Sequence, residues 1–242
     1  MLLFSLVINA QTSDELFSKA NNLYQNGKYS EAIKLYTSIE KQGLKSDDLF
    51  FNLGNCYYKL NKVAPSIYYY EKALKINPIH QDTSFNLAFA KRMSIDVIED
   101  LPQTFLQRFS STVIQKLTFE TWAIIAILAS FLVAVLFLLY HFSYSSKKKL
   151  FYFNTSIFAL FVLIITTFFA FHNYDTVQKN RAAIIFVDKV EIKNAPSTNS
   201  ETVFELHEGT KVVILDELES WQKIKIADGK IGWIYAKDLK EI

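Results

Sequence analysis

The residues that could carry out catalysis are few and far apart in this sequence. The four histidines, His80, His141, His172 and His207, lie in different regions, which argues against a shared metal or acid–base site. His207 and Glu208 are followed by Gly-Thr-Lys, so they are not the His-Glu-x-x-His pair of a zinc helix. The chain also lacks a Gly-rich phosphate loop and a Gly-x-Ser-x-Gly nucleophile turn. We therefore expect a protein that is not an enzyme and that holds no metal and no cofactor.

Cys56 is the single cysteine, which excludes an intramolecular disulfide, a Cys-rich zinc site and a Cys-x-x-Cys redox pair. It has no His or acidic partner at nucleophile spacing. A small buried side chain is therefore the expectation, rather than a reactive thiol.

The composition indicates a membrane part. Half of the 242 residues are apolar, 15% are aromatic and 21% are charged. The mean hydropathy of +0.12 is too high for one ordinary soluble domain. A net charge of +2, spread along the chain, gives no electrostatic basis for binding nucleic acid.

The N-terminus begins with a short apolar run, residues 2–8, followed by Asn9 and Ala10. A run of seven residues cannot span a bilayer, and the run is typical of the apolar region of an export signal. Residues 1–10 are therefore interpreted as a signal-like segment, although the basic residues that usually precede such a run are missing. The alternative is a frayed apolar terminus.

The next segment repeats itself with an offset of 34 residues. Ala20 and Asn21 align with Gly54 and Asn55, and Tyr36 aligns with Tyr70. Small residues at a helix crossing and a closing proline, Pro78, complete the pattern in the second unit. The pattern resembles the tetratricopeptide repeat, which is a pair of helices. We assign units to residues 13–46 and 47–80 and a half unit to 81–98.

The resemblance implies a concave face formed by the first helix of each unit. Aromatic side chains alternate with asparagines along it, which suits an extended peptide or a helix of a partner protein. The lining residues are Phe17, Asn21, Tyr24, Phe51, Asn55, Tyr58, Phe85, Phe89 and Arg92. The alternative is that the phenylalanines belong to the core and the asparagines are merely solvated. The carboxylate-clamp variant of the family has Lys where this chain has Phe51 and Phe85, so a chaperone C-terminus is not the expected ligand.

Two long apolar runs follow. Residues 122–142 and 151–171 are each long enough to cross a bilayer, and neither shows a polar stripe. Residues 103–121 before them have apolar side chains at spacings near four, which predicts an amphipathic helix at the membrane surface. A core helix under the repeats is the alternative.

The basic turn at 143–149, with Lys147, Lys148 and Lys149, predicts that this turn faces the cytoplasm. Both soluble regions then lie on the periplasmic side of the inner membrane, in agreement with an export signal. The spans contain no ionisable residue in their interior, so an ion path is not indicated.

From residue 183 onward the pattern becomes β. Five or six short strand-like runs with turns at Asn194-Ala195-Pro196, Glu208-Gly209 and Asp228-Gly229 predict a small closed barrel over 183–242. The order Asn-Ala-Pro-Ser, Leu-His-Glu-Gly-Thr, Trp221 and Asp-Gly-Lys-Ile-Gly-Trp resembles the bacterial Src-homology-3-like (SH3-like) domain. Trp221 and Trp233 either line a groove or fill the core of this barrel.

The predicted fold class is a multidomain membrane protein, with all-α tetratricopeptide helix pairs, a two-helix transmembrane hairpin and a small all-β SH3-like barrel. This order is similar to the BatE-type proteins of the bacterial aerotolerance operon. That resemblance implies an assembly factor of the cell envelope that works with membrane-anchored von Willebrand A-domain proteins and a MoxR-type ATPase.

Two functions remain from the sequence. In one, the protein is a membrane-tethered scaffold that binds a partner peptide or helix in the repeat groove. In the alternative, the barrel is the working part and anchors the protein to peptidoglycan.

Overall fold

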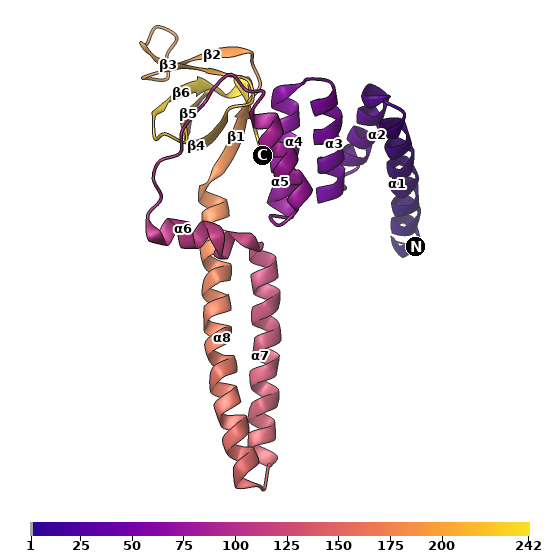
Figure 1. The fold of residues 1–242 in the computed structure, drawn as a ribbon, viewed down its shortest axis with the longest axis vertical. Helices are drawn as coiled ribbons and strands as arrows, with labels where there is room; N and C mark the ends of the chain where they lie inside the picture. The colour runs from indigo at the N-terminus through magenta and orange to yellow at the C-terminus, as the bar shows by residue number, and fades with distance from the viewer. Residues whose placement is uncertain (1) are drawn as a thin grey trace. The chain divides into compact units, whose positions relative to one another are not determined.

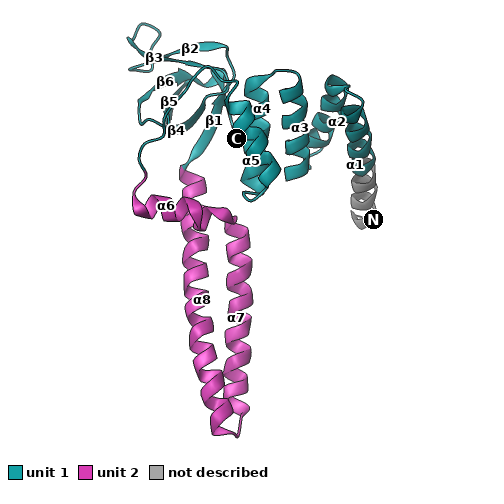
Figure 2. Cartoon of the chain, viewed as in Figure 1, with its two compact units in different colours: residues 1–102, 180–242 teal, residues 103–179 magenta. Residues whose placement is uncertain are grey.

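The structure is a computed structural model that describes residues 2–242, with side chains described from Ser13 onward. It divides into two compact units (Figure 2). Unit 1 consists of residues 1–102 and 180–242, and unit 2 of residues 103–179. The predicted signal-like segment, residues 1–10, lies outside the residues whose side chains are described.

The N-terminal part of unit 1 is a row of helices that pack one after another (Figure 1). Its helices are α1 (Leu2–Gln25), α2 (Tyr29–Lys41), α3 (Asp47–Lys59), α4 (Val63–Ile76) and α5 (Gln81–Lys91). Local sequence sets their starts: the Ser46 hydroxyl accepts a hydrogen bond from the Leu49 amide at the start of α3, and the His80 ring accepts one from the Thr83 amide at the start of α5. The helix pairs predicted from the 34-residue offset are therefore present.

The helix crossings are packed by one small residue against one tyrosine. Ala20 of α1 and Gly54 of α3 are buried, as are Tyr36 of α2 and Tyr70 of α4. A Cβ atom on Gly54 would lie 3.0 Å or less from ring atoms of Tyr70, which leaves no room for a side chain. The crossing of α3 with α4 therefore requires a glycine at position 54.

Two aromatic side chains of α3 that pack on α4 have polar counterparts on α5, the last helix of the row. Counting in steps of 34, the buried Phe50 is followed by Ser84, and Tyr57 is followed by Lys91. Ser84 and Lys91 are both exposed. α5 therefore ends the helix row with exposed Ser84 and Lys91 as well as the exposed Phe85 and Phe89.

The C-terminal part of unit 1 is an antiparallel sheet with the strand order β3-β2-β6-β5-β4-β1-β7. The strands are β1 (Arg181–Ile185), β2 (Lys189–Lys193), β3 (Thr202–His207), β4 (Lys211–Leu218), β5 (Trp221–Lys225), β6 (Ile231–Tyr235) and β7 (Leu239–Glu241). β7 has only three residues, too few to show alternation, and the sequence did not predict it. β3 and β7 lie at the two ends of the strand order, and this antiparallel all-β domain matches the SH3-like fold class that was expected.

β1 belongs to two hydrophobic cores at once, because successive side chains of a strand point to opposite faces. Ala183 and Ile185 pack in the core of the sheet, with Ile192, Ile224 and Ile234. Ile184 between them is completely buried in the core of the helices. The helices and the sheet of unit 1 are thus joined by shared burial.

Unit 2 is dominated by a helical hairpin of α7 (Phe119–Phe142) and α8 (Ser146–Lys179), preceded by α6 (Phe105–Thr112) and the 3₁₀ turn η1 (Ile114–Lys116). α7 and α8 are each long and apolar enough to cross a membrane. Few side chains are buried within the hairpin: Ala129, Leu136, Ala159, Thr166 and Asn173. Most of the large apolar side chains point outward along both helices.

The structure differs from the sequence in two places in this unit. The single amphipathic helix expected over 103–121 is broken, because Ser111 and Thr112 donate hydrogen bonds to the Arg108 carbonyl and Thr118 caps a new helix. Lys147–Lys149 do not lie in the turn, which consists of Ser143–Ser145 only. They occupy the first turn of α8.

Candidate functional site

The predicted groove residues fall into two groups by exposure. Phe17 and Phe51 are half-buried, because each packs on the tyrosine of the next helix: Phe17 lies 5.6 Å from Tyr36 and Phe51 lies 6.2 Å from Tyr70, between ring centroids. Tyr24 and Tyr58 are also half-buried against the helix core. These four aromatic rings contribute edges, rather than whole faces, to any surface that a partner could reach.

The asparagines of the groove bind within the protein. The Asn55 Oδ1 atom accepts hydrogen bonds from the Tyr70 hydroxyl at 2.6 Å and from the Asn86 amide at 2.8 Å. The Asn21 Oδ1 atom accepts the equivalent bonds from Tyr36 and Asn52. Each asparagine thus ties three helices together, so its carbonyl is not available for the backbone of a partner.

This hydrogen-bond network was not recognised in the sequence. Its members nevertheless recur at the repeat offset, since Asn21, Tyr36 and Asn52 become Asn55, Tyr70 and Asn86 after 34 residues. Polar residues that recur with the repeat could therefore have been interpreted as structural.

α5 carries the exposed part of the predicted surface. Phe85 is 65% exposed and Phe89 is 50% exposed. The Arg92 guanidinium lies 5.3 Å from the centre of the Phe89 ring, which is within range of a cation–π contact. Phe85 is exposed because the third unit has no second helix to supply the tyrosine that covers Phe17 and Phe51.

Polar contacts hold the segment after α5 to the sheet. Both carboxylate oxygens of Asp96 are used: one accepts from the His207 amide at 2.7 Å and from the Thr210 hydroxyl at 2.6 Å, and the other lies 2.7 Å from His207 Nδ1. Burial raises the pKa of Asp96, but the hydrogen bonds from Thr210 and His207 outweigh it and leave the pKa below its usual value.

A second polar contact lies between α4 and the sheet. The buried carboxylate of Glu71 lies 2.6 Å from the Lys211 ammonium and 3.1 Å from that of Lys91. Burial raises the pKa of Glu71, and the two lysines outweigh it, so that the pKa is lowered overall. Unit 1 is therefore held by charged contacts as well as by the shared core at Ile184.

The two tryptophans of the sheet have different environments. Trp221 is buried and stacks on Tyr235, with 4.0 Å between ring centroids. Trp233 is half-exposed, and the Lys223 ammonium lies 5.9 Å from the centre of its ring. Of the predicted pair, only Trp233 is partly accessible.

The described residues hold no cluster of His, Cys, Asp and Glu that could bind a metal ion. Cys56 is buried in the helix core, and burial raises the pKa of its thiol to about 12. The thiol is therefore protonated at neutral pH and poorly nucleophilic.

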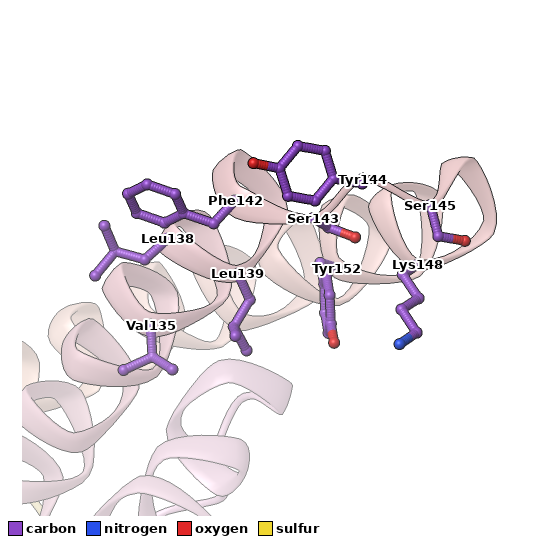
Figure 3. A pocket seen from close by; sticks show the side chains of 9 residues that line it. All are labelled: Val135, Leu138, Leu139, Phe142, Ser143, Tyr144, Ser145, Lys148 and Tyr152. Atoms are coloured by element: carbon purple, nitrogen blue, oxygen red, sulfur yellow. The ribbon is translucent and has the colours of Figure 1, made fainter.

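A hollow of about 620 Å³ lies at the loop end of the hairpin in unit 2 (Figure 3). Its wall on α7 is apolar, and the remaining lining is polar or aromatic. The lining residues are Val135, Leu138, Leu139, Phe142, Ser143, Tyr144, Ser145, Lys148 and Tyr152.

Comparison with known proteins identifies two modules. Residues 48–80, which contain α3 and α4, match the family model of the tetratricopeptide repeat. Residues 188–240, which contain β2 to β6, match that of the bacterial SH3 domain. A search of curated proteins finds no match to the chain. The chain thus combines a tetratricopeptide repeat and a bacterial SH3 domain with two apolar helices that are candidate membrane spans.

Proposed function

We propose that this protein is a membrane-tethered scaffold or assembly factor of the bacterial cell envelope, which binds a peptide or helix of a partner protein on the concave side of its helix row. The observation that carries the proposal is the exposed pair Phe85 and Phe89 on α5. Exposed aromatic side chains next to a cation, here Arg92, are typical of the anchor points of protein interfaces.

The half-buried aromatics extend this surface toward the N-terminus. Phe17 and Phe51 hold the same repeat position as Phe85, so the three rings mark a line across α1, α3 and α5. An extended peptide or a helix laid along this line would contact all three rings. The proposed partner therefore contributes apolar side chains, anchored most strongly at α5.

Co-purification of the full chain in mild detergent tests this function. Replacing both Phe85 and Phe89 by Ala should reduce the yield of partner at least tenfold, because truncating an anchor residue costs about 2 kcal/mol or more. Val203→Ala is the control, since Val203 is about as exposed as Phe89, at 52% against 50%, but lies on β3. Equal yields from both variants would refute the groove as the binding surface.

The cellular setting is a proposal from the resemblance to BatE-type proteins. In that setting the partners are membrane-anchored von Willebrand A-domain proteins, and the protein lies in the inner membrane with both soluble regions on the periplasmic side. The apolar lengths of α7 and α8 and the lysines at their loop end support this placement.

The alternative function is anchoring to peptidoglycan through the SH3 domain. The half-exposed Trp233 beside Lys223 favours it, because an aromatic face and a cation suit sugar rings and acidic groups. The full chain should then sediment with purified peptidoglycan, and Trp233→Ala should abolish sedimentation while the double replacement at Phe85 and Phe89 leaves it unchanged.

A further inference from the structure

The hollow at the loop end of the hairpin joins a cationic side to an apolar side. Val135, Leu138, Leu139 and Phe142 follow one another at helical spacing and form one face of α7. Lys148, in the first turn of α8, lines the same hollow. The hollow therefore offers a charge and an apolar wall to the same ligand.

The polar groups of the hollow lie next to Lys148. Ser143, Tyr144 and Ser145 of the turn line the hollow, and Tyr152 follows Lys148 by one helical turn. The side chains of Lys148 and Tyr152 extend in the same direction as those of Val135 and Leu139 (Figure 3). Hydroxyl groups and an ammonium group thus lie together at one end of an apolar stripe.

The lysines at this end have no acidic counterpart in unit 2. The acidic residues of the unit are Glu120, in the first turn of α7, and Asp175, close to the end of α8. Both belong to the opposite end of the hairpin, and Asp175 is paired with Lys179 at 2.7 Å. Lys147, Lys148 and Lys149 therefore form an uncompensated positive cluster.

The position of the lysines in α8 makes this cluster more unusual. The N-terminus of a helix carries a partial positive charge, so that acidic residues are favoured there and lysines are disfavoured. The first turn of α8 holds three lysines and no acidic residue. An anion at this place would be favoured both by the lysines and by the free amides of the helix end.

We propose that this hollow binds one anionic phospholipid, with its phosphate at Lys148 and an acyl chain along the α7 face. The inference rests on the membrane placement proposed above. A lipid satisfies both sides of the hollow: its phosphate accepts hydrogen bonds from the ammonium and hydroxyl groups, and its chain covers apolar side chains. A free phosphate ion would leave the apolar wall without a partner.

Native mass spectrometry of the full chain tests the proposal. The protein is extracted from vesicles of equal parts phosphatidylcholine and phosphatidylglycerol, and the lipids that stay bound are counted. We expect one retained phosphatidylglycerol, not displaced by excess glycerol 3-phosphate. Equal retention of both lipids, or displacement by glycerol 3-phosphate, would overturn the site although the protein is in the membrane. Retention of no lipid at all would overturn the site, and failure of the chain to insert into the vesicles would overturn the membrane placement itself.

Neighbouring lysines provide matched controls, because only Lys148 lines the hollow. Lys147→Gln and Lys149→Gln remove the same charge and should weaken retention about fivefold, as expected for a general surface potential. Lys148→Gln should weaken it roughly thirtyfold, because it also removes a charged hydrogen bond. Lys148→Arg should restore retention. Equal losses of retention in all three Gln variants would show a general charge effect instead of a site and would overturn the proposal.

Discussion

At the scale of single residues, the packing of the helices in unit 1 depends on a few positions that admit only one type of residue. Gly54 allows Tyr70 to reach the Asn55 carbonyl, and that carbonyl in turn receives Asn86 from the next helix. One glycine therefore determines both the crossing of α3 with α4 and the hydrogen bonds that continue to α5. One unit earlier, Tyr36 likewise donates to the Asn21 carbonyl, and the small residue at the corresponding position is the buried Ala20.

Gly54→Ala should destabilise unit 1 by about 1–3 kcal/mol, because the new Cβ atom would overlap the ring of Tyr70. Phe85→Ala removes a larger side chain but an exposed one, and should change stability by only about 0.5 kcal/mol. Urea unfolding of the purified chain, followed by far-UV circular dichroism, measures both. A larger loss for Phe85→Ala than for Gly54→Ala would contradict this packing.

Unit 1 should lose stability in acid, because the contribution of Asp96 is lost there. The pKa of Asp96 is lower in the folded protein than in the unfolded chain, so the stability it contributes is present at neutral pH and is lost as the pH falls below about 4. Asp96→Asn should cost about 1.5–3 kcal/mol at pH 7, because a carboxylate that accepts three close contacts is lost. Hydrogen exchange at His207 and Thr210, measured from pH 7 to pH 3.5, reports the local stability of the native chain and of Asp96→Asn. The difference in stability between the two proteins should shrink toward low pH. A constant difference would show that the charge of Asp96 has no role.

At the scale of elements, the periodicity of the sequence predicted the regular helices and most strands. It did not predict a helix break that depends on single side chains or a strand of three residues. The helix pairs, the two apolar helices and most strands follow from spacing and hydrophobicity, and they are present. The break at Val113 depends on serine and threonine hydroxyls that turn back to the Arg108 carbonyl. β7 has too few residues to show a pattern, and it is defined by pairing with β1.

For the candidate groove, the sequence predicted the positions of the residues but not their exposure. The 34-residue offset placed all nine residues on the first helices of the units, but it could not tell which rings are covered. Coverage depends on the second helix of each unit, which is present beside Phe17 and Phe51 and missing beside Phe85. Whether these residues bind a partner remains a prediction.

β1 should stabilise the helices as well as the sheet, because Ile184 is buried in the helix core. Ile184→Ala should cost about 2–5 kcal/mol and should speed hydrogen exchange in α4. Ile185→Ala is the matched control, since its side chain lies in the core of the sheet. It should be equally costly but should speed exchange mainly in β4 and β7. If both variants leave exchange in α4 unchanged, the shared core does not stabilise the helix row.

At the scale of the whole molecule, the proposed membrane placement requires that both halves of unit 1 lie on the same side of the membrane, because they share a core while unit 2 intervenes between them in the sequence. A two-helix hairpin meets this requirement, since an even number of spans returns the chain to the side from which it came. In the proposed membrane placement, the lysines of α8 put the loop end on the cytoplasmic side.

Cysteine labelling of spheroplasts should confirm this topology. A membrane-impermeant maleimide should modify Thr198→Cys, in the exposed turn between β2 and β3, and should spare Ser145→Cys at the loop end of the hairpin. The native Cys56 should give little background, since its thiol is buried and its pKa is raised to about 12. Modification of Ser145→Cys alone would reverse the topology.

The central claim is that the exposed aromatic surface of α5 contacts a partner protein. Site-specific photocrosslinking in cells tests it most directly, with a benzophenone amino acid placed at Phe85 in one variant and at Ile79 in the other. Both side chains are more than half exposed, at 65% and 57%, but Ile79 lies in the turn before α5. We predict one defined crosslinked protein band from position 85 that is absent from position 79. The same bands from both positions, or none from position 85, would contradict the account.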